Sequence, residues 1–203
     1  LFERLGYMSA DDFRRATDLP QVKSDVLPRG RALGMGEISS LISSCAIDSG
    51  CAGVRDAPLL AVLYGAGLRR SEIIKLSLAD YNTDTGELRV LASKGRKDRL
   101  TYLSGGAAQA LQDWMAMRGT EPGPLFCHVN KGGRIVLRQL SDQSVRTVLL
   151  KRGQQAGVLK FAPHDMRRSF ITNLLDSGAD TFVVQQLAGH SDPKTTKRYD
   201  RRG

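Results

Sequence analysis

The pattern of apolar and polar residues along the chain predicts a domain built mainly from helices. Apolar residues often recur at the i, i+3 and i+4 spacing of a helix with one buried face, as at Leu59, Leu60 and Leu63. Gly178 and Gly189 stand where glycine commonly ends a helix. Helices are predicted over residues 35–49, 58–76, 107–118, 140–157, 166–177, 180–188 and 193–201.

One stretch has a different character and predicts a β-hairpin. Two short β-prone runs, residues 87–92 and 99–103, flank the basic sequence KGRKD at 94–98, as strands flank a turn. The expected fold class is therefore α+β and mainly α-helical, with one small antiparallel β-sheet or hairpin.

The chain is expected to contain one whole domain and the end of another. Residues 1–18 have a helix-like mixture of polar and apolar side chains, and residues 19–31 carry prolines, a glycine and charges without periodicity. We therefore expect the tail of an upstream domain at 1–18, a linker at 19–31 and a globular domain at 32–203. Since the sequence opens with Leu1 rather than Met, a longer parent chain is expected.

The charge balance favours a polyanionic partner. Thirty Lys and Arg residues stand against 21 Asp and Glu, a formal net charge of +9, although composition alone leaves a basic surface without such a partner equally open. No apolar run reaches the roughly 18 residues of a membrane span, and no secretion signal is present. The three cysteines are expected to be reduced thiols of a cytosolic protein, and burial is favoured over a disulfide between Cys45 and Cys51.

Motifs of several phosphate-processing enzymes are absent from the sequence. No cluster of acidic residues suits a two-metal nuclease, no GxxxxGK[ST] loop is present to hold a nucleotide, and no HExxH motif is present to bind zinc. We therefore expect neither a metal nor a cofactor. A protein of this kind that acts on phosphates needs cations of its own in place of Mg²⁺.

Side chains suited to phosphate chemistry occur at separate places along the chain. Taken singly, each is better explained by a structural role, such as a solvated arginine, a turn lysine, a histidine at a helix end or a packed tyrosine. His164 and Arg167 are three residues apart in a predicted helix and so share a face. The whole set is Arg69, Lys94, His164, Arg167, His190 and Tyr199.

Taken together, these residues resemble the tyrosine recombinase, or phage integrase, family. The segments GLRRSE, SKGRKDR, PHDMRRSFITNLLDSG and LAGHSDPKTTKRY are similar to that family's four boxes, in the right order, over about residues 32–200. Tyr199 follows His190 by nine positions, as in the family. The resemblance implies the fold of a tyrosine recombinase catalytic domain, preceded at 1–18 by the tail of a core-DNA-binding domain.

The resemblance also implies a role for each matching residue. Arg69 and Arg167 are expected to bind the scissile phosphate, and His190 to donate a hydrogen bond to it. Lys94 and His164 are expected to act as acid–base residues. Planar guanidinium groups suit the charge that an attacked phosphodiester gains, because each offers paired donors in a fixed fork.

Tyr199 is expected to be the nucleophile, with Glu72 orienting an arginine. A tyrosine hydroxyl is a weak nucleophile at neutral pH, and nearby positive charge favours its phenolate form. A phosphotyrosine retains the energy of the cut bond, so that a DNA hydroxyl can reseal it without ATP. The resemblance implies a 3′-phosphotyrosine and a free 5′-hydroxyl. Further basic residues are expected to contact DNA: Arg70, Arg96, Lys97, Arg99, Arg168, Lys197 and Arg198.

The function expected is site-specific recombination of double-stranded DNA by a homotetramer, in the cytoplasm at the nucleoid and not at a membrane. Three alternatives stay open: a type IB topoisomerase, a degenerate integrase acting as a regulator, and an RNA-binding helical domain. The LAGH box disfavours the topoisomerase, and the four intact boxes disfavour the degenerate integrase. An aromatic content of 6% disfavours the RNA-binding domain. The target site, the mobile element or chromosome-resolution system served, and donation of the tyrosine in cis or in trans are not determined by the sequence. Only four residues follow Tyr199, where family members often continue with a segment that packs on a neighbouring protomer.

Overall fold

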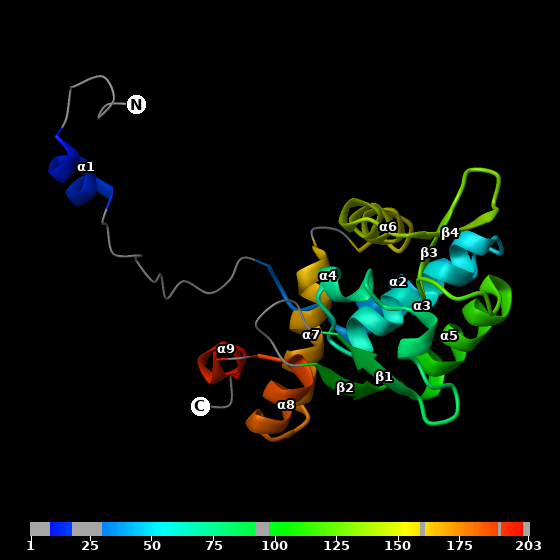
Figure 1. Ribbon diagram of the computed structural model, residues 1–203. Helices are drawn as coiled ribbons and strands as arrows, with labels where there is room; N and C mark the ends of the chain where they lie inside the picture. Colours follow the sequence, from blue (N-terminus) through cyan, green and yellow to red (C-terminus); the bar gives the residue numbers. More distant parts are fainter. Residues whose placement is uncertain (1–8, 18–29, 92–97, 159–160, 191, 201–203) are drawn as a thin grey trace.

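The computed structural model describes residues 9–17, 30–91, 98–158, 161–190 and 192–200 (Figure 1). Within them a mainly helical fold carries two small hairpins. The elements in chain order are α1 (Ala10–Thr17), α2 (Met35–Ala46), α3 (Cys51–Gly65), α4 (Arg70–Ile73), a 3-10 turn η1 (Leu78–Asp80), β1 (Glu87–Val90), β2 (Arg99–Tyr102), α5 (Gly105–Arg118), β3 (Cys127–Val129), β4 (Ile135–Gln139), α6 (Asp142–Gln155), α7 (Pro163–Asp176), α8 (Thr181–Ala188) and α9 (Pro193–Lys197).

The long helix predicted over 58–76 is wrong, because the chain breaks between α3 and α4. Gly67 lies in this break with a φ of +56°, a conformation that glycine adopts without strain. A Cβ atom at this position would lie 2.3 Å from Cδ1 of Phe170 in α7. The break leaves Arg69 in an extended conformation just before α4, instead of inside a helix.

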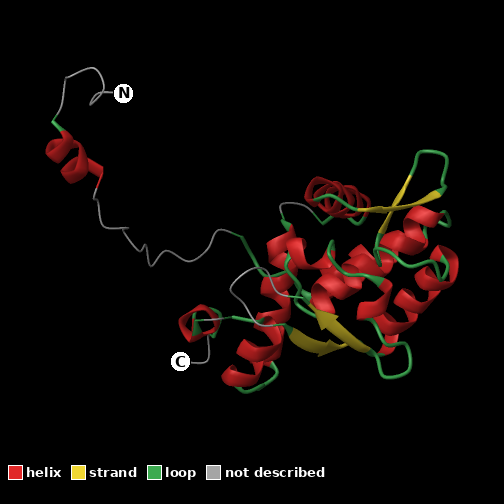
Figure 2. Ribbon diagram, viewed as in Figure 1, coloured by secondary structure: helices red, strands yellow, loops and turns green. Residues whose placement is uncertain are grey.

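The predicted hairpin is present. β1 and β2 pair antiparallel, with Glu87 opposite Tyr102 and Val90 opposite Arg99. Its basic tip, including Lys94, Arg96 and Lys97, lies outside the described residues. A second antiparallel pair, β3 with β4, was not predicted, and Figure 2 shows it on a different side of the helical body from β1 and β2.

The hydrophobic core surrounds α3, which packs against α2, α5 and α7. Leu59, Leu60 and Leu63 are fully buried there, as their spacing predicts. Trp114 of α5 is also buried, and its indole N–H is satisfied by the carbonyl of Leu125 at 2.8 Å. Within the described part of the chain, no helix is both long and apolar enough to cross a membrane.

A smaller apolar cluster joins α7 and α8 to the end of the chain. Ile171, Leu175, Val184 and Ala188 are fully buried in it, and Tyr199 is 7% exposed. Helix α8 also packs against β2. These contacts fix the C-terminal end of α8 between the first hairpin and α7, where the candidate catalytic side chains lie.

Candidate active site

Three consecutive carbonyl groups at the C-terminal end of α8 each accept a hydrogen bond from a different arginine. The last carbonyls of a helix have no partner inside it and carry its negative partial charge, so they suit guanidinium donors. The pairs are Arg99 Nε with Leu187 O at 3.0 Å, Arg167 Nη2 with Ala188 O at 2.5 Å, and Arg69 Nη2 with Gly189 O at 3.0 Å. We call Arg69, Arg99 and Arg167, with Glu72, the arginine cluster.

Arg167 is the most deeply buried member of the arginine cluster, at 1% exposure. Besides Ala188, its guanidinium binds the carbonyl of Gly67 at 2.6 Å, which the break after α3 presents to it. Burial, followed by repulsion from Arg69, lowers the pKa of Arg167 to about 9. The group remains charged at neutral pH and is poorly screened, which strengthens its attraction for an anion.

Glu72 links the other two arginines of the cluster. Its buried carboxylate accepts bonds from Arg69 Nη1 at 2.5 Å and from Arg99 Nη2 at 2.8 Å, and also from the Arg69 backbone N–H at 2.9 Å. Burial alone would raise the pKa of Glu72. The hydrogen bonds and charge of Arg99, together with those of Arg69, outweigh burial and lower the pKa to about 2. The orienting role of Glu72 stays a prediction, and the carboxylate contacts two of the arginines that such a role concerns.

Arg99 does not lie where the sequence prediction placed it. It was expected to contact DNA phosphates or remain solvated, yet its side chain is only 10% exposed and is ion-paired with Glu72. The reason is that β2 packs against α8, which turns Arg99 inward onto Glu72 and the carbonyl of Leu187.

Both predicted histidines lie close to the arginine cluster. His190 follows α8, and its Nδ1 lies 2.8 Å from the hydroxyl of Thr196. Burial, then the charges of Arg167 and Arg69, lower the pKa of His190 to about 3. The pKa of His164 is lowered by burial first and by Arg167 next. Both imidazoles are therefore neutral at pH 7, able to donate from one ring nitrogen and accept at the other.

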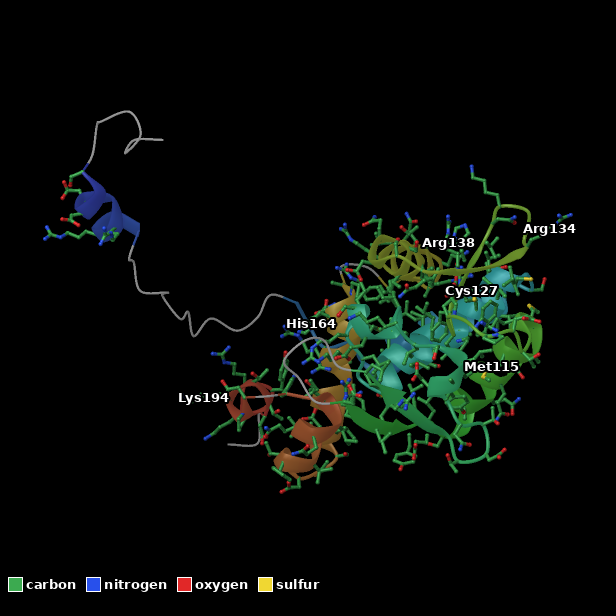
Figure 3. All side chains as sticks on the ribbon, viewed as in Figure 1. Met115, Cys127, Arg134, Arg138, His164 and Lys194 are labelled. Carbon is green, nitrogen blue, oxygen red and sulfur yellow. The ribbon has the colours of Figure 1, made fainter. Side chains whose placement is uncertain are left out.

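His164 lies at the start of α7, on the side of the molecule from which α9 projects (Figure 3). Together with Arg69 it lines a cavity of about 490 Å³, whose other walls come from the starts of α4 and α7 and from Asp142. This cavity places an open space beside Arg69 and a neutral imidazole. Among the residues that the structure describes, no group of three or more His, Cys, Asp or Glu side chains could hold a metal ion.

Tyr199 lies beside His190, just after α9. The two rings stack with centroids 6.3 Å apart and an angle of 18° between their planes. The guanidinium carbon of Arg168 lies 5.5 Å from the centre of the tyrosine ring, within range of a cation–π interaction. Arg168 was predicted to be a surface or DNA-backbone residue, and is instead 8% exposed, because it packs over this ring.

The remaining predicted DNA contacts are distributed unevenly. Arg70 is half-buried and pairs with Asp142 at 3.2 Å, while Lys197 and Arg198 are exposed at the end of α9. Lys94, Arg96 and Lys97 lie outside the described residues. The structure thus brings together Arg69, His164, Arg167, His190 and Tyr199.

Two residues of α7 that the sequence reasoning missed connect this site to the start of the domain. Asp165 accepts hydrogen bonds from the backbone N–H groups of Arg31 at 3.1 Å and Ala162 at 2.9 Å. Ser169 accepts one from Leu33 N–H at 2.7 Å. An acidic residue three positions after a helix N-cap is a known capping signal, which could have found Asp165.

Comparisons with known proteins agree with the fold and identify the family. Residues 32–202 match the model of the phage integrase family, and the chain therefore belongs to this family of tyrosine recombinases. It is 33% identical over 200 residues to the tyrosine recombinase XerC of Corynebacterium glutamicum, covering 97% of this chain and 61% of that protein. It is 39% identical over 149 residues to the XerC of Proteus mirabilis, covering 72% and 47%.

Solved structures show the same architecture. The XerA recombinase superimposes with a TM-score of 0.74 at 25% identity, covering 94% of this chain and 68% of that one. A lambda integrase dimer bound to a core site gives a TM-score of 0.67 at 16% identity, covering 100% and 56%, and this likeness concerns the fold alone. The chain spans roughly half to two thirds of the length of the curated relatives described here.

Proposed function

We propose that the protein is a site-specific DNA recombinase that cuts and rejoins double-stranded DNA through a 3′-phosphotyrosine at Tyr199, without metal or ATP. The observation that carries this proposal is the arginine cluster, which gathers three guanidinium groups around the end of α8 with one carboxylate, Glu72, paired to two of them. The similarity to XerC recombinases supports the same activity.

Arg69 and Arg167 are proposed to bind the non-bridging oxygens of the scissile phosphate. Their remaining N–H groups, together with a donor from His190, form an anion site whose geometry is fixed by the α8 carbonyls and Gly67. Donors held in place need no reorganisation when the phosphate gains charge, and removing one typically costs about 10²–10³ in rate.

Two proton transfers accompany the reaction. Neutral His164 is suited to take the proton of the Tyr199 hydroxyl, whose oxygen then attacks phosphorus as the bond to the 5′ oxygen breaks. Lys94, by family resemblance, gives a proton to that departing oxygen; a positioned general acid contributes about 10²–10⁴ in rate. Attack by a 5′-hydroxyl on the phosphotyrosine reverses these steps and rejoins the DNA.

The wider organisation follows from the same proposal. We assign residues 1–18 to the tail of an upstream core-DNA-binding domain, 19–31 to a linker and 32–203 to the catalytic domain. The protein is proposed to act as a homotetramer on DNA at the nucleoid in the cytoplasm. The net charge of +9 and the exposed Lys197 and Arg198 support binding to the DNA backbone.

A nicked duplex that cannot religate tests the proposal. The full-length enzyme should become covalently attached, and peptide mapping should place the DNA on Tyr199. Tyr199→Phe should abolish the adduct and leave DNA affinity nearly unchanged, since the change removes a hydroxyl and no charge. Attachment at Tyr7, Tyr64, Tyr81 or Tyr102 would refute the assignment. Strand exchange between two duplexes separates a recombinase from a topoisomerase, which relaxes only one.

A further inference from the structure

Arg99 connects three parts of the site that are far apart in the sequence. It is the first residue of β2, and its side chain, only 10% exposed, binds Glu72 and the end of α8. Its Nη1 and Nη2 bind the two carboxylate oxygens of Glu72 at 3.2 and 2.8 Å, and its Nε binds the carbonyl of Leu187 at 3.0 Å. Only a planar fork with several fixed donors can make this set of bonds at once.

The first consequence concerns charge. Glu72 is shared between Arg69 and Arg99, so its negative charge neutralises neither arginine completely. Without Arg99, the same carboxylate would pair with Arg69 alone. Arg69 would then present less positive charge to a phosphate, because a buried pair at close range is poorly screened.

The second consequence concerns the end of α8. The carbonyl of Leu187, which Arg99 holds, directly precedes those that bind Arg167 and Arg69, and His190 comes next. Gly189, with a φ of +63°, packs so closely on Arg99 that a Cβ atom would lie 3.0 Å from Arg99 Nη1. Arg99 therefore holds the turn that places His190.

We propose that Arg99 is a positioning residue for DNA cleavage. It does not contact DNA. By pairing with Glu72, it leaves Arg69 with more positive charge for the phosphate. By holding the end of α8, it keeps His190 in position to donate a hydrogen bond to the phosphate. This inference rests on the proposed function. It predicts a defect in the chemical step with little change in DNA affinity.

The experiment uses full-length enzyme and a nicked duplex, and measures the single-turnover cleavage rate at saturating DNA. Arg99→Met should lower this rate by about 10²-fold, the scale of losing one preorganised donor, with the dissociation constant changed less than about threefold. Arg99→Lys should recover part of the rate, because it restores the charge without the fork. The double variant with Glu72→Gln and Arg99→Met should cleave faster than Arg99→Met alone, because Arg69 is no longer neutralised.

Arg89→Met is the matched control. Arg89 lies opposite Leu100 on the neighbouring strand and is ion-paired with buried Asp80 at 3.1 Å, outside the arginine cluster. Arg89→Met should leave the cleavage rate at saturating DNA unchanged when the rate is expressed per folded molecule. Thermal unfolding gives the folded fraction of each variant at the assay temperature. A wild-type rate for Arg99→Met, or a defect only in affinity or folding, overturns the inference while Tyr199 attachment still stands.

A DNA-free crystal structure of Arg99→Lys and of the double variant gives a readout that does not depend on cleavage. In Arg99→Lys, the carbonyl of Leu187 should lose its guanidinium donor, and the bond between Arg69 and Gly189 should lengthen. If the wild type forms no adduct at all, the proposed function fails. The two variant structures still show whether Arg99 positions Arg69 and His190. Unchanged positions of Arg69 and His190 in both variants overturn the positioning role.

Discussion

Two clusters of arginine side chains in this molecule differ in how their charge is balanced. Between α2, α3 and α6, buried Arg55 and Arg152 meet Asp48 and Asp56; Arg152, with no exposed surface, lies 2.7 Å from Asp56 and 2.8 Å from Asp48. We call these four residues the interhelix network. In the arginine cluster, one carboxylate, Glu72, pairs with two of the three guanidinium groups, and all three bind backbone carbonyl groups.

The difference indicates what each cluster is for. A buried charge is costly unless it is paired, and the interhelix network meets this requirement within the protein itself. The arginine cluster keeps positive charge that its own carboxylate does not balance, in a place where a cavity opens beside Arg69. Such an excess suits an anion that arrives from outside. The comparison therefore predicts rate defects in one cluster and stability defects in the other.

The largest effect is expected for Arg167→Ala in the arginine cluster. The single-turnover cleavage rate should fall by about 10²–10³, since the charge that Arg167 meets peaks in the transition state. DNA affinity should fall less. Rates and dissociation constants measured on the nicked duplex check this, and an affinity loss equal to the rate loss would mean that Arg167 serves only binding.

Asp56→Ala should break the interhelix network. It leaves two buried arginines without their closest carboxylate, a change that typically costs about 3–5 kcal/mol. We expect a large fall in the free energy of unfolding from denaturant titration, but an unchanged cleavage rate per folded molecule. Where this variant does not fold, Asp48→Asn gives a milder form of the same test. A slowed chemical step in folded enzyme would show that the two clusters are not separate in function.

The pH dependence of stability should report on His190, with a smaller effect. Its pKa is about 3 in the fold against an ordinary value of 6.5, so between these values the unfolded chain binds a proton that the folded chain does not. Stability should therefore fall as the pH drops below about 6.5, and further below about 4.5 as Glu72 begins to contribute. His190→Gln should lose less free energy of unfolding between pH 7.5 and 5.5 than the wild type. Equal losses would contradict the burial of a neutral imidazole.

The sequence was informative about which residues lie close together at the candidate site. The order and spacing of the boxes predicted Arg69, His164, Arg167, His190 and Tyr199, and these lie together. Periodicity also located most helices, because burial of one helix face leaves a repeat that a single sequence records.

It was less informative where a residue's environment comes from distant parts of the chain. The break contains Gly67, where Phe170, about a hundred residues later, leaves no room for a side chain, and local apolar spacing does not reveal this contact. The local sequence around Arg99 and Arg168 is typical of exposed cations. Their burial comes from tertiary contacts, of Arg99 with the end of α8 and of Arg168 with the Tyr199 ring. The second hairpin did have a local signal, the Asn-Lys-Gly-Gly turn at 130–133 between two β-prone runs.

We propose that the unbalanced positive charge of the arginine cluster stabilises the attacked phosphate as a divalent ion does in other enzymes. The most direct test is the rate of Tyr199 adduct formation on the nicked duplex in excess EDTA, compared with the rate in Mg²⁺. We expect the adduct to form in EDTA at a similar rate, and to form about 10²–10³-fold more slowly in Arg167→Ala under both conditions. An adduct that disappears in EDTA and returns with Mg²⁺, while DNA binding persists, would contradict it.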